Sequence, residues 1–587
     1  MKSVPLVHYT ISLPQPQQHI LEVAITIKGL TDDRTLLRMP AWTPGSYLLR
    51  DYARHVRSFR AYTDDQPCSW RKIDRLTWDI DTANHAEITV QYQVYGHELT
   101  VRTNHVDDTH AHIIPAATFM YVPEHNEPAW VTLNIPENWR IATGLDPIAD
   151  QPNTFVARDL DELMDCPIEA GIHQRYDWTI DDKRHSLVIW GNGNEDPARL
   201  VADTSKIVAA QRDFWGGLPY QHYTFFLLLA GSSAGGGLEH RNSTSLLLPR
   251  HTFKPARAYE RFLSLTSHEF FHTWNVKRLR SEVLGPFDYT QENYTRLLWV
   301  MEGFTEYYTD LFLVRAGLLT PQRYLERLAD DITTLQTTAG RKLHSLSASS
   351  FDTWIKFYRP DESTPNTTIS YYLKGAMAAL VLDMLLRERS NGTVSLDDLM
   401  RYLYQTYPFE SAGIPEVNGI RDALNAILPG EWDEFFSRYI DGVEELPFDH
   451  ALHTVGIDLK WDYVNKSETG QPQAKLGIRT KTVDGRIHVT HVLDGGSAAA
   501  AGIAPLDEII ALDNNLITES TLEKRLADYA IGATVELTFF RHEMLKTLPV
   551  KLLEVMPDQA QLIAVEQPSN AQRTNAHAWL GADLWKQ

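Results

Sequence analysis

Two histidines and a glutamate at helical spacing are the residues of this sequence best suited to chemistry. The segment 266–275 contains His268, Glu269 and His272, so that the histidines are four positions apart. In a helix, residues i and i+4 lie on the same face, and two imidazoles can therefore bind one metal ion. Zinc accepts two imidazoles and a carboxylate with one position left open, which is the arrangement of a catalytic site. Glu269 would then accept a proton from a metal-bound water.

The motif has a competing interpretation. With 23 histidines in 587 residues, a His-Glu-x-x-His motif arises by chance with a probability of roughly 5%. Phe262, Phe271 and Trp274 predict a buried helix over about 258–276, in which two histidines need partners. Both histidines could instead be satisfied by hydrogen bonds within the core.

A third ligand has to come from elsewhere in the chain. The carboxylates downstream of the motif include Glu282, Glu292, Glu302 and Glu306. Glu302 and Glu306 lie four apart in an aromatic, helix-like stretch, where an acidic group is costly unless it is paired or bound to a metal. One of the two could bind the ion while the other holds a ligand in position. An exposed glutamate on a helix face is the alternative for either.

Three further segments occur in a fixed order around this motif. Gly-Gly-Gly-Leu-Glu-His at 235–240 follows a predicted strand, Trp-x-x-Glu-Gly-Phe spans 299–304, and Ser-Tyr-Tyr-Leu-Lys-Gly at 370–375 opens a predicted helix. With the histidine helix, this order resembles the gluzincin aminopeptidases. The chain is most similar to peptidase family M61, the glycyl aminopeptidase-like group, over nearly its whole length. Trp-Thr-Pro-Gly-Ser-Tyr at 42–47 belongs to the same resemblance.

The resemblance implies a metal site and a general base. His268, His272 and Glu302 would bind one zinc ion per chain, and Glu269 would be the general base. Glu306 is then left to hold a metal ligand in position. Between His272 and Glu302 lie 29 residues, more than in the M1 branch of the clan.

The same resemblance implies how a substrate is held. Glu239 would bind the free α-ammonium group, because a carboxylate pairs with an ammonium group in a closed pocket. Gly236 and Gly237 would let the substrate backbone approach the strand, since neither has a Cβ. Tyr372 would donate a hydrogen bond to the oxyanion of the tetrahedral intermediate, with the adjacent Tyr371 as the competing candidate.

The predicted fold class is multidomain α+β. Residues 1–172 are expected to form a β-sandwich-like domain, and 173–450 a thermolysin-like catalytic domain whose second half is mostly helical. Residues 451–556 resemble a bacterial-type PDZ domain, which would bind a peptide or a C-terminus, or would serve only as structure. The tail, 557–587, is either disordered or docked through its tryptophans.

Composition excludes several functional classes. Lys and Arg number 55 against 76 Asp and Glu, a net charge of −21, which argues against nucleic acid and anionic membranes as partners. Two isolated cysteines offer no metal site or disulfide framework. The first nine residues lack the apolar core of a signal peptide and no apolar run approaches ~18 residues, so a cytoplasmic location is expected. Lys277, Arg278 and Arg280 could meet a substrate carboxylate or form a solvated surface.

The sequence therefore predicts a zinc aminopeptidase that removes N-terminal residues of the Gly or Ala type from peptides through a metal-activated water. Two alternatives stay open. The chain could be a peptide-binding PDZ scaffold with a degenerate peptidase fold, or an endopeptidase of the same clan.

Overall fold

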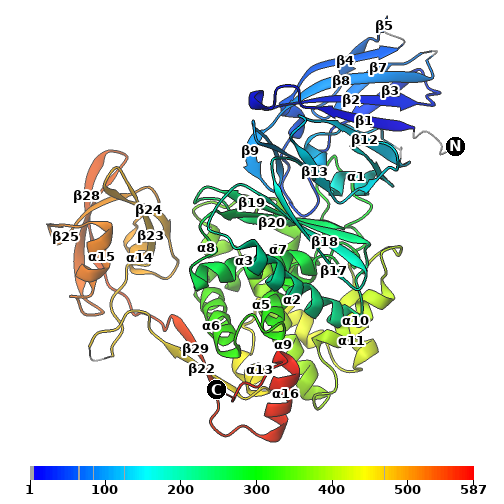
Figure 1. Ribbon diagram of the computed structural model, residues 1–587. Helices are drawn as coiled ribbons and strands as arrows, with labels where there is room; N and C mark the ends of the chain where they lie inside the picture. The colour runs from blue at the N-terminus through cyan, green and yellow to red at the C-terminus, as the bar shows by residue number, and fades with distance from the viewer. Residues whose placement is uncertain (1–5, 64–65, 84, 124–125, 469, 587) are drawn as a thin grey trace. The chain divides into compact units, whose positions relative to one another are not determined.

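The computed structural model describes residues 6–63, 66–83, 85–123, 126–468 and 470–586 (Figure 1). They form two compact units. The first comprises Met1–Thr295, Tyr308–Leu318 and Met400–Ile420, and the second Arg296–Tyr307, Leu319–Leu399 and Arg421–Gln587. The expectation about a signal peptide rests partly on residues 1–5, which lie outside the described residues.

The first unit begins with two sheets that are antiparallel except where β1 and β12 pair in parallel, and strands such as β1 and β8 alternate between more and less buried residues. An eight-stranded sheet has the order β14 (Asp146–Pro147), β15 (Thr154–Ala157), β12 (Ala129–Asn134), β1 (Val7–Ser12), β2 (Ile20–Lys28), β8 (Glu87–Tyr95), β4 (Val56–Thr63), β5 (Gln66–Pro67). A three-stranded sheet has the order β3 (Arg34–Arg38), β7 (Thr77–Asp81), β6 (Trp70–Lys72). Phe59 of β4 stacks on Trp78 of β7, with ring centroids 5.6 Å apart. The apolar faces of the two sheets therefore pack together, as the sandwich-like prediction requires.

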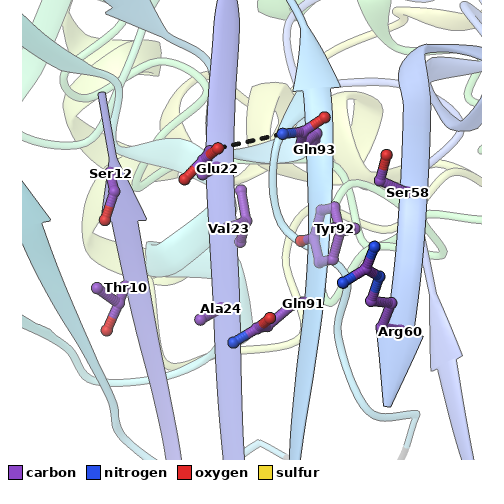
Figure 2. A pocket seen from close by; sticks show the side chains of 10 residues that line it. All are labelled: Thr10, Ser12, Glu22, Val23, Ala24, Ser58, Arg60, Gln91, Tyr92 and Gln93. Carbon is purple, nitrogen blue, oxygen red and sulfur yellow. Dashed lines mark hydrogen bonds between the residues drawn. The ribbon is translucent and has the colours of Figure 1, made fainter. Parts of the chain in front are cut away.

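One face of the eight-stranded sheet is polar. Figure 2 shows side chains from its neighbouring strands lining a pocket, among them Gln93, whose amide donates a 3.1 Å hydrogen bond to Glu22. Residues on this face alternate with the buried Val23 and Tyr92 on the other.

Two further sheets of the first unit approach the functional residues. A five-stranded sheet has the order β13 (Arg140–Thr143), β16 (Ile168–Gly171), β11 (His110–Ile113), β10 (Thr103–Val106), β9 (His97–Thr100). The other has the order β17 (Gln174–Ile180), β18 (Lys183–Trp190), β19 (His222–Ala230), β21 (Ser243–Pro249), β20 (Gly236–Glu239). Its central strands are parallel and buried, whereas β20 is antiparallel and ends the order. An end strand leaves one backbone edge for another chain.

Helices α2 (Pro197–Trp215) and α3 (Ala256–Phe271) pack on this second sheet (Figure 1). The apolar stripe of α3 turns Phe271 toward α2, where its ring lies 5.4 Å from that of Trp215. The predicted helix over 258–276 is confirmed in place, but it ends at Phe271, and His272 caps it.

The second unit is mostly helical. Its helices include α4 (Leu298–Met301), the start of α5 (Gly303–Arg315), α6 (Pro321–Thr337), α9 (Tyr371–Arg389), α11 (Gly419–Ile427) and α13 (Phe448–His453). Gly303 and Gly375 face each other where α5 begins beside α9, and a Cβ on Gly303 would lie 2.6 Å from the Cα of Gly375. Glycine is therefore required at both positions for the two backbones to meet, which explains why both motifs contain one.

Helix α9 belongs to the core. The helical stretch Thr364–Arg389 is long and apolar enough, by length and composition, to cross a membrane, but 78% of its most apolar window is buried within the protein. Burial of this kind is typical of a core helix of a globular protein.

The C-terminal segments form a PDZ sheet and a separate strand pair. The PDZ sheet contains β23 (Ile478–Val483), β24 (Arg486–Val492), β25 (Glu508–Leu512), β26 (Asn515–Leu516), β27 (Thr534–Arg541) and β28 (Met544–Lys551), with helices α14 (Ser497–Ala501) and α15 (Glu519–Leu526). Strand β22 (Ile457–Asp462), placed within the PDZ unit by the sequence analysis, pairs instead with β29 (Gln559–Ala564) of the tail. The tail continues into α16 (Asn570–Leu580), and the fully buried Trp579 donates a 2.9 Å hydrogen bond to the Tyr307 hydroxyl. The tail is docked.

Candidate active site

The two motif histidines point at one another at the end of α3. Their Nε2 atoms are 3.1 Å apart. The Nδ1 atom of His272 lies 2.7 Å from the backbone oxygen of Asn275 and must donate to it, because a carbonyl only accepts. The Nε2 atom of a neutral His272 therefore carries a lone pair. The Nδ1 atom of His268 is 3.0 Å from the Thr309 hydroxyl of α5.

Asn275 and Thr309 were not identified from the sequence. Each holds a histidine ring by the nitrogen that points away from the pair, which is how metal-binding histidines are usually oriented. Asn275 lies only three residues after His272, so the sequence places the two residues close together. The predicted helix to 276, however, would direct the backbone carbonyl of Asn275 away from the His272 ring. Thr309 lies 41 residues from His268, and only the folded chain brings it close.

Glu269 lies between the histidine pair and strand β20. It is buried, and a Cβ on Gly237 would be only 1.9 Å from its Oε1 atom. The missing side chain of Gly237 therefore makes the space that this carboxylate occupies. Ligand atoms of Glu239, Glu269 and His272 all lie within 4.8 Å of one another, so the predicted base and the predicted amine-binding residue converge on the same histidine.

The carboxylate of Glu239 is enclosed by the loop at 42–47. A Cβ on Gly45 would lie 2.6 Å from its Oε1 atom, and Gly45 has a φ of +82°. Glycine is thus needed both for the left-handed backbone and for the contact. Trp42 anchors this loop by donating a 2.9 Å hydrogen bond to the backbone oxygen of Asp288. The resulting pocket is lined by Gly45, Glu239 and charged side chains of the first unit.

Lys277 and Asp165 form a buried ion pair beside this pocket. Lys277 Nζ is 2.7 Å from Asp165 Oδ1 and 4.0 Å from Glu239 Oε1. Burial disfavours the ammonium form of Lys277, but the carboxylates of Asp165 and Glu239 outweigh it and raise its pKa. Because Asp165 is the nearer partner, its carboxylate neutralises most of the charge of Lys277. The negative charge of Glu239 can therefore still attract a second cation.

The other members of the basic cluster have structural partners. Arg278 is buried and donates to the backbone oxygens of Arg241 and Thr273 at 2.9 and 2.7 Å. The Arg280 guanidinium lies over the Phe409 ring at 5.0 Å. Neither is a solvated surface charge, which was one of the two expectations for this cluster.

His240 directly follows strand β20. Its side chain is buried, with Nδ1 3.6 Å from Asp165 Oδ1, and burial lowers its pKa. The ring is therefore neutral at physiological pH and belongs to the Asp165–Lys277 cluster.

The remaining predicted residues lie in the helical second unit. Glu302 is buried at the junction of α4 and α5, whereas Glu306 is exposed on α5. Tyr371 is fully buried and its hydroxyl accepts a 3.0 Å hydrogen bond from Thr353. Tyr372 stacks on Tyr371 and is only partly buried, so Tyr372 is the more exposed of the two tyrosines.

Comparison with known proteins identifies three segments of the chain. Residues 8–172 match the peptidase M61 N-terminal domain, 261–378 match M61 glycyl aminopeptidase, and 474–552 match a PDZ domain. An aminopeptidase N family protein from Idiomarina loihiensis, known from its crystal structure, is 31% identical with a TM-score of 0.91, covering 98% of this chain and 100% of that one. The chain belongs to peptidase family M61. It is a peptidase with an N-terminal β domain and a C-terminal PDZ domain, as predicted.

A more distant similarity accompanies this M61 match. An M1 zinc metallopeptidase from Deinococcus radiodurans is 15% identical with a TM-score of 0.47, covering 75% of this chain and 95% of that one. No protein of curated function matches.

The contact between Gly237 and Glu269 predicts that Gly237→Ala lowers the activity of this M61 peptidase without unfolding it. The new methyl group would meet the end of the Glu269 side chain, 1.9 Å from its ideal position, and the carboxylate would have to turn away. A displacement of about 1 Å in a catalytic group can cost roughly 100-fold in rate. We expect a loss of that order in kcat/KM, with a thermal unfolding midpoint close to that of the wild type.

Gly231→Ala is the matched control, because no atom lies within 4 Å of its ideal Cβ position and its φ is not in the left-handed region. It should leave both activity and stability unchanged. Full activity in Gly237→Ala would show that the carboxylate of Glu269 does not need its present position.

Proposed function

We propose that this chain is a zinc-dependent aminopeptidase that removes N-terminal residues, of the Gly or Ala type, from peptides. The observation that carries the proposal is the pair of Nε2 atoms 3.1 Å apart at the end of a His-Glu-x-x-His helix. The imidazoles of His268 and His272 converge there, and the Nδ1 atom of each ring has a hydrogen-bond partner. Glu269 follows the first of them in sequence. The family description, M61 glycyl aminopeptidase, supports the small N-terminal residue.

The residues present fit a zinc ion. His268, His272 and Glu302 would supply two imidazoles and one carboxylate, which is a donor set of catalytic zinc sites. Because the other ring nitrogen of His272 donates to a carbonyl, its Nε2 atom is available as a ligand in the neutral ring. We assign the support of the two rings to Thr309 and Asn275, and not to the exposed Glu306.

Hydrolysis needs a nucleophilic water and a proton carrier. A bound zinc ion would supply Lewis acidity, polarising the scissile carbonyl group and lowering the pKa of a water molecule. Glu269 would accept the proton of that water and pass it to the leaving amine. Its buried position against Gly237 fixes the carboxylate beside strand β20, where the substrate would be bound.

Strand β20 and Tyr372 would position the peptide. As the end strand of its sheet, β20 offers a backbone edge to an extended substrate. Gly236 and Gly237 add no side chain of their own to this strand, although Arg102 donates a 3.4 Å hydrogen bond to the backbone oxygen of Gly237. Tyr372, on the first turn of α9, would donate a hydrogen bond to the oxygen that becomes negatively charged.

Glu239 would make the enzyme an aminopeptidase. Its carboxylate is buried, enclosed by Gly45, and already faces one ammonium group, that of Lys277, at 4.0 Å. The α-ammonium group of a free N-terminus would add a second cation on the pocket side. An endopeptidase of the same clan has no need of this pocket, and a blocked N-terminus would leave the Glu239 charge buried without that partner.

The PDZ domain is proposed to bind a peptide strand in addition. Such domains add a peptide to a sheet edge, and the match over 474–552 supports this role. A scaffold with a degenerate catalytic domain is disfavoured because His268, Glu269, His272, Glu302 and Tyr372 are all retained.

Removal of metal tests the proposed function. Protein dialysed against a chelator is expected to lose at least about 100-fold in the hydrolysis of glycyl and alanyl 4-nitroanilides, and added zinc should restore it. Calcium is the control ion, since it prefers oxygen ligands and should not restore activity. Full activity of the metal-free protein, or equal cleavage of N-acetylated and free substrates, would refute a zinc aminopeptidase.

A further inference from the structure

A second cluster of metal-binding side chains lies in the five-stranded sheet of the first unit. One ligand atom from each of His105, Asp107 and His110 lies within 4.8 Å of the others. His105 is on β10, His110 begins β11, and Asp107 lies in the connection between them. None of these residues belongs to the site built around His268 and His272.

A buried carboxylate orients the histidines of this cluster. Glu169 of β16 is fully buried, and its two oxygens lie 2.8 Å from His110 Nδ1 and 3.0 Å from His112 Nδ1. A carboxylate only accepts hydrogen bonds, so both Nδ1 atoms donate. In a neutral ring the Nε2 atom of His110 then carries a lone pair, which is the tautomer of a metal-binding histidine braced by a carboxylate.

Buried nitrogen atoms of this cluster lack hydrogen-bond partners among the residues that the structure describes. They are Nε2 of His110 and Nδ1 of His105, in side chains that are more than nine-tenths buried. Leaving a buried polar atom unsatisfied costs roughly 1–3 kcal/mol. A bound cation would satisfy the lone pair of His110 Nε2, whereas the His105 atom that faces Asp107 is Nε2 and not the unpartnered Nδ1.

Asp107 supplies a carboxylate whose two oxygens have different tasks. Its Oδ1 atom accepts hydrogen bonds from the backbone N–H groups of Thr109 and His110 at 2.7 and 3.0 Å, and from the Thr109 hydroxyl at 2.7 Å. Its Oδ2 atom is turned to His105, 3.3 Å from Nε2. The connection between the strands is thus fixed by one oxygen, and the other faces the histidines. The side chain is 25% exposed, which leaves a path from solvent.

Packing holds the His110 ring in one orientation. The ring stacks on Trp190 of β18, with centroids 3.5 Å apart and planes at 10°. Trp190 in turn donates a 3.1 Å hydrogen bond to the Thr109 hydroxyl. A ligand that cannot rotate loses little entropy on binding, so the cluster is pre-organised.

We propose that His105, Asp107 and His110 form a second metal site, for a transition-metal dication such as zinc. Two imidazoles and one carboxylate suit zinc and its neighbours in the first transition row, and do not suit calcium or magnesium. All three ligands lie on β10, β11 or the connection between them, so the ion would hold this connection in place. The site would therefore stabilise the fold and take no part in hydrolysis.

Metal counting on the full-length protein tests this proposal. Metal-free protein is given zinc alone, freed of excess by gel filtration, and its zinc content is measured by mass spectrometry. We expect two equivalents for the wild type, and one for His105→Gln and for Asp107→Asn. The asparagine variant keeps an oxygen for the N–H groups of Thr109 and His110, so it should stay folded. Zinc should also raise the unfolding midpoint of the wild type more than that of either variant.

Two further variants separate this site from the proposed catalytic one. His272→Gln should lose one equivalent and keep the other, and combining it with Asp107→Asn should remove both. The control His251→Gln alters an exposed histidine and should keep two equivalents. A wild type that binds one equivalent, lost with His272→Gln, would overturn the proposal and indicate a histidine cluster that holds a proton instead. A second equivalent that persists in both His105→Gln and Asp107→Asn would overturn it as well.

Discussion

The Glu269→Gln variant is expected to keep its metal and to lose peptide hydrolysis by a factor of about 10² to 10⁴. Glutamine has nearly the size of glutamate and fills the same space against Gly237, but its amide cannot accept a proton from water. In free energy, the loss corresponds to roughly 3–5 kcal/mol of transition-state stabilisation. We expect the loss in kcat, since the peptide is still bound by groups that the substitution leaves in place.

Three measurements make this result specific. The zinc content should equal that of the wild type, because Glu269 is not one of the proposed ligands. The thermal unfolding midpoint should change little. Glu326→Gln, which removes the carboxylate of a surface ion pair with Arg323 on α6, should keep full activity. Near-normal turnover by Glu269→Gln would refute its role as the base, and a loss of activity together with zinc would show a structural role instead.

The sequence predicted those parts of the site that depend on local spacing. His268 and His272 are four residues apart on one helix, and their Nε2 atoms do meet. In β2 and β8 alternate apolar residues form a buried face, as a β-sandwich-like domain over 1–172 requires. The glycines of the motifs at 299–304 and 370–375 also have a physical cause, because α5 and α9 touch there.

Features that depend on distant segments could not be predicted. Thr309 and Asn275 hold the histidines, but nothing in their own types distinguishes them from other polar residues near a helix. Lys277 looks like part of a basic surface cluster, yet its partner Asp165 is 112 residues earlier in the chain. The pairing of β22 with β29 joins segments that lie before and after the PDZ sheet in the chain, and no sequence spacing links the two.

The histidine cluster of the N-terminal domain shows the same limit. His105, Asp107 and His110 are close in sequence, but strand periodicity alone puts alternate residues on opposite faces. The connection after β10 changes this alternation, because Asp107 accepts hydrogen bonds from the backbone that follows it. The orienting carboxylate, Glu169, comes from a strand 57 residues after His112. Its contribution becomes visible only when β11 and β16 are paired.

Replacement of Glu239 by alanine should abolish the preference for a free N-terminus. The substrate ammonium group would lose its buried carboxylate partner, and truncating one member of such a pair costs roughly 2–5 kcal/mol. We therefore expect kcat/KM for glycyl and alanyl 4-nitroanilides to fall between about 30-fold and about 5,000-fold. Hydrolysis of N-acetylated substrates, already slow, should stay the same or rise. These substrates carry no ammonium group, and in the alanine variant there is no Glu239 carboxylate that needs one.

Glu239→Gln separates charge from packing in this prediction. It keeps the contact with Gly45 but removes the negative charge, so it should lose activity toward free N-termini nearly as far as the alanine variant. Folding should survive in both, since Lys277 retains its closer partner, Asp165, at 2.7 Å. The decisive quantity is the ratio of kcat/KM for free and acetylated substrates. If Glu239 acted only through packing, its replacement would change kcat/KM equally for free and acetylated substrates. A ratio unchanged from the wild type would therefore mean that the ammonium group is recognised elsewhere.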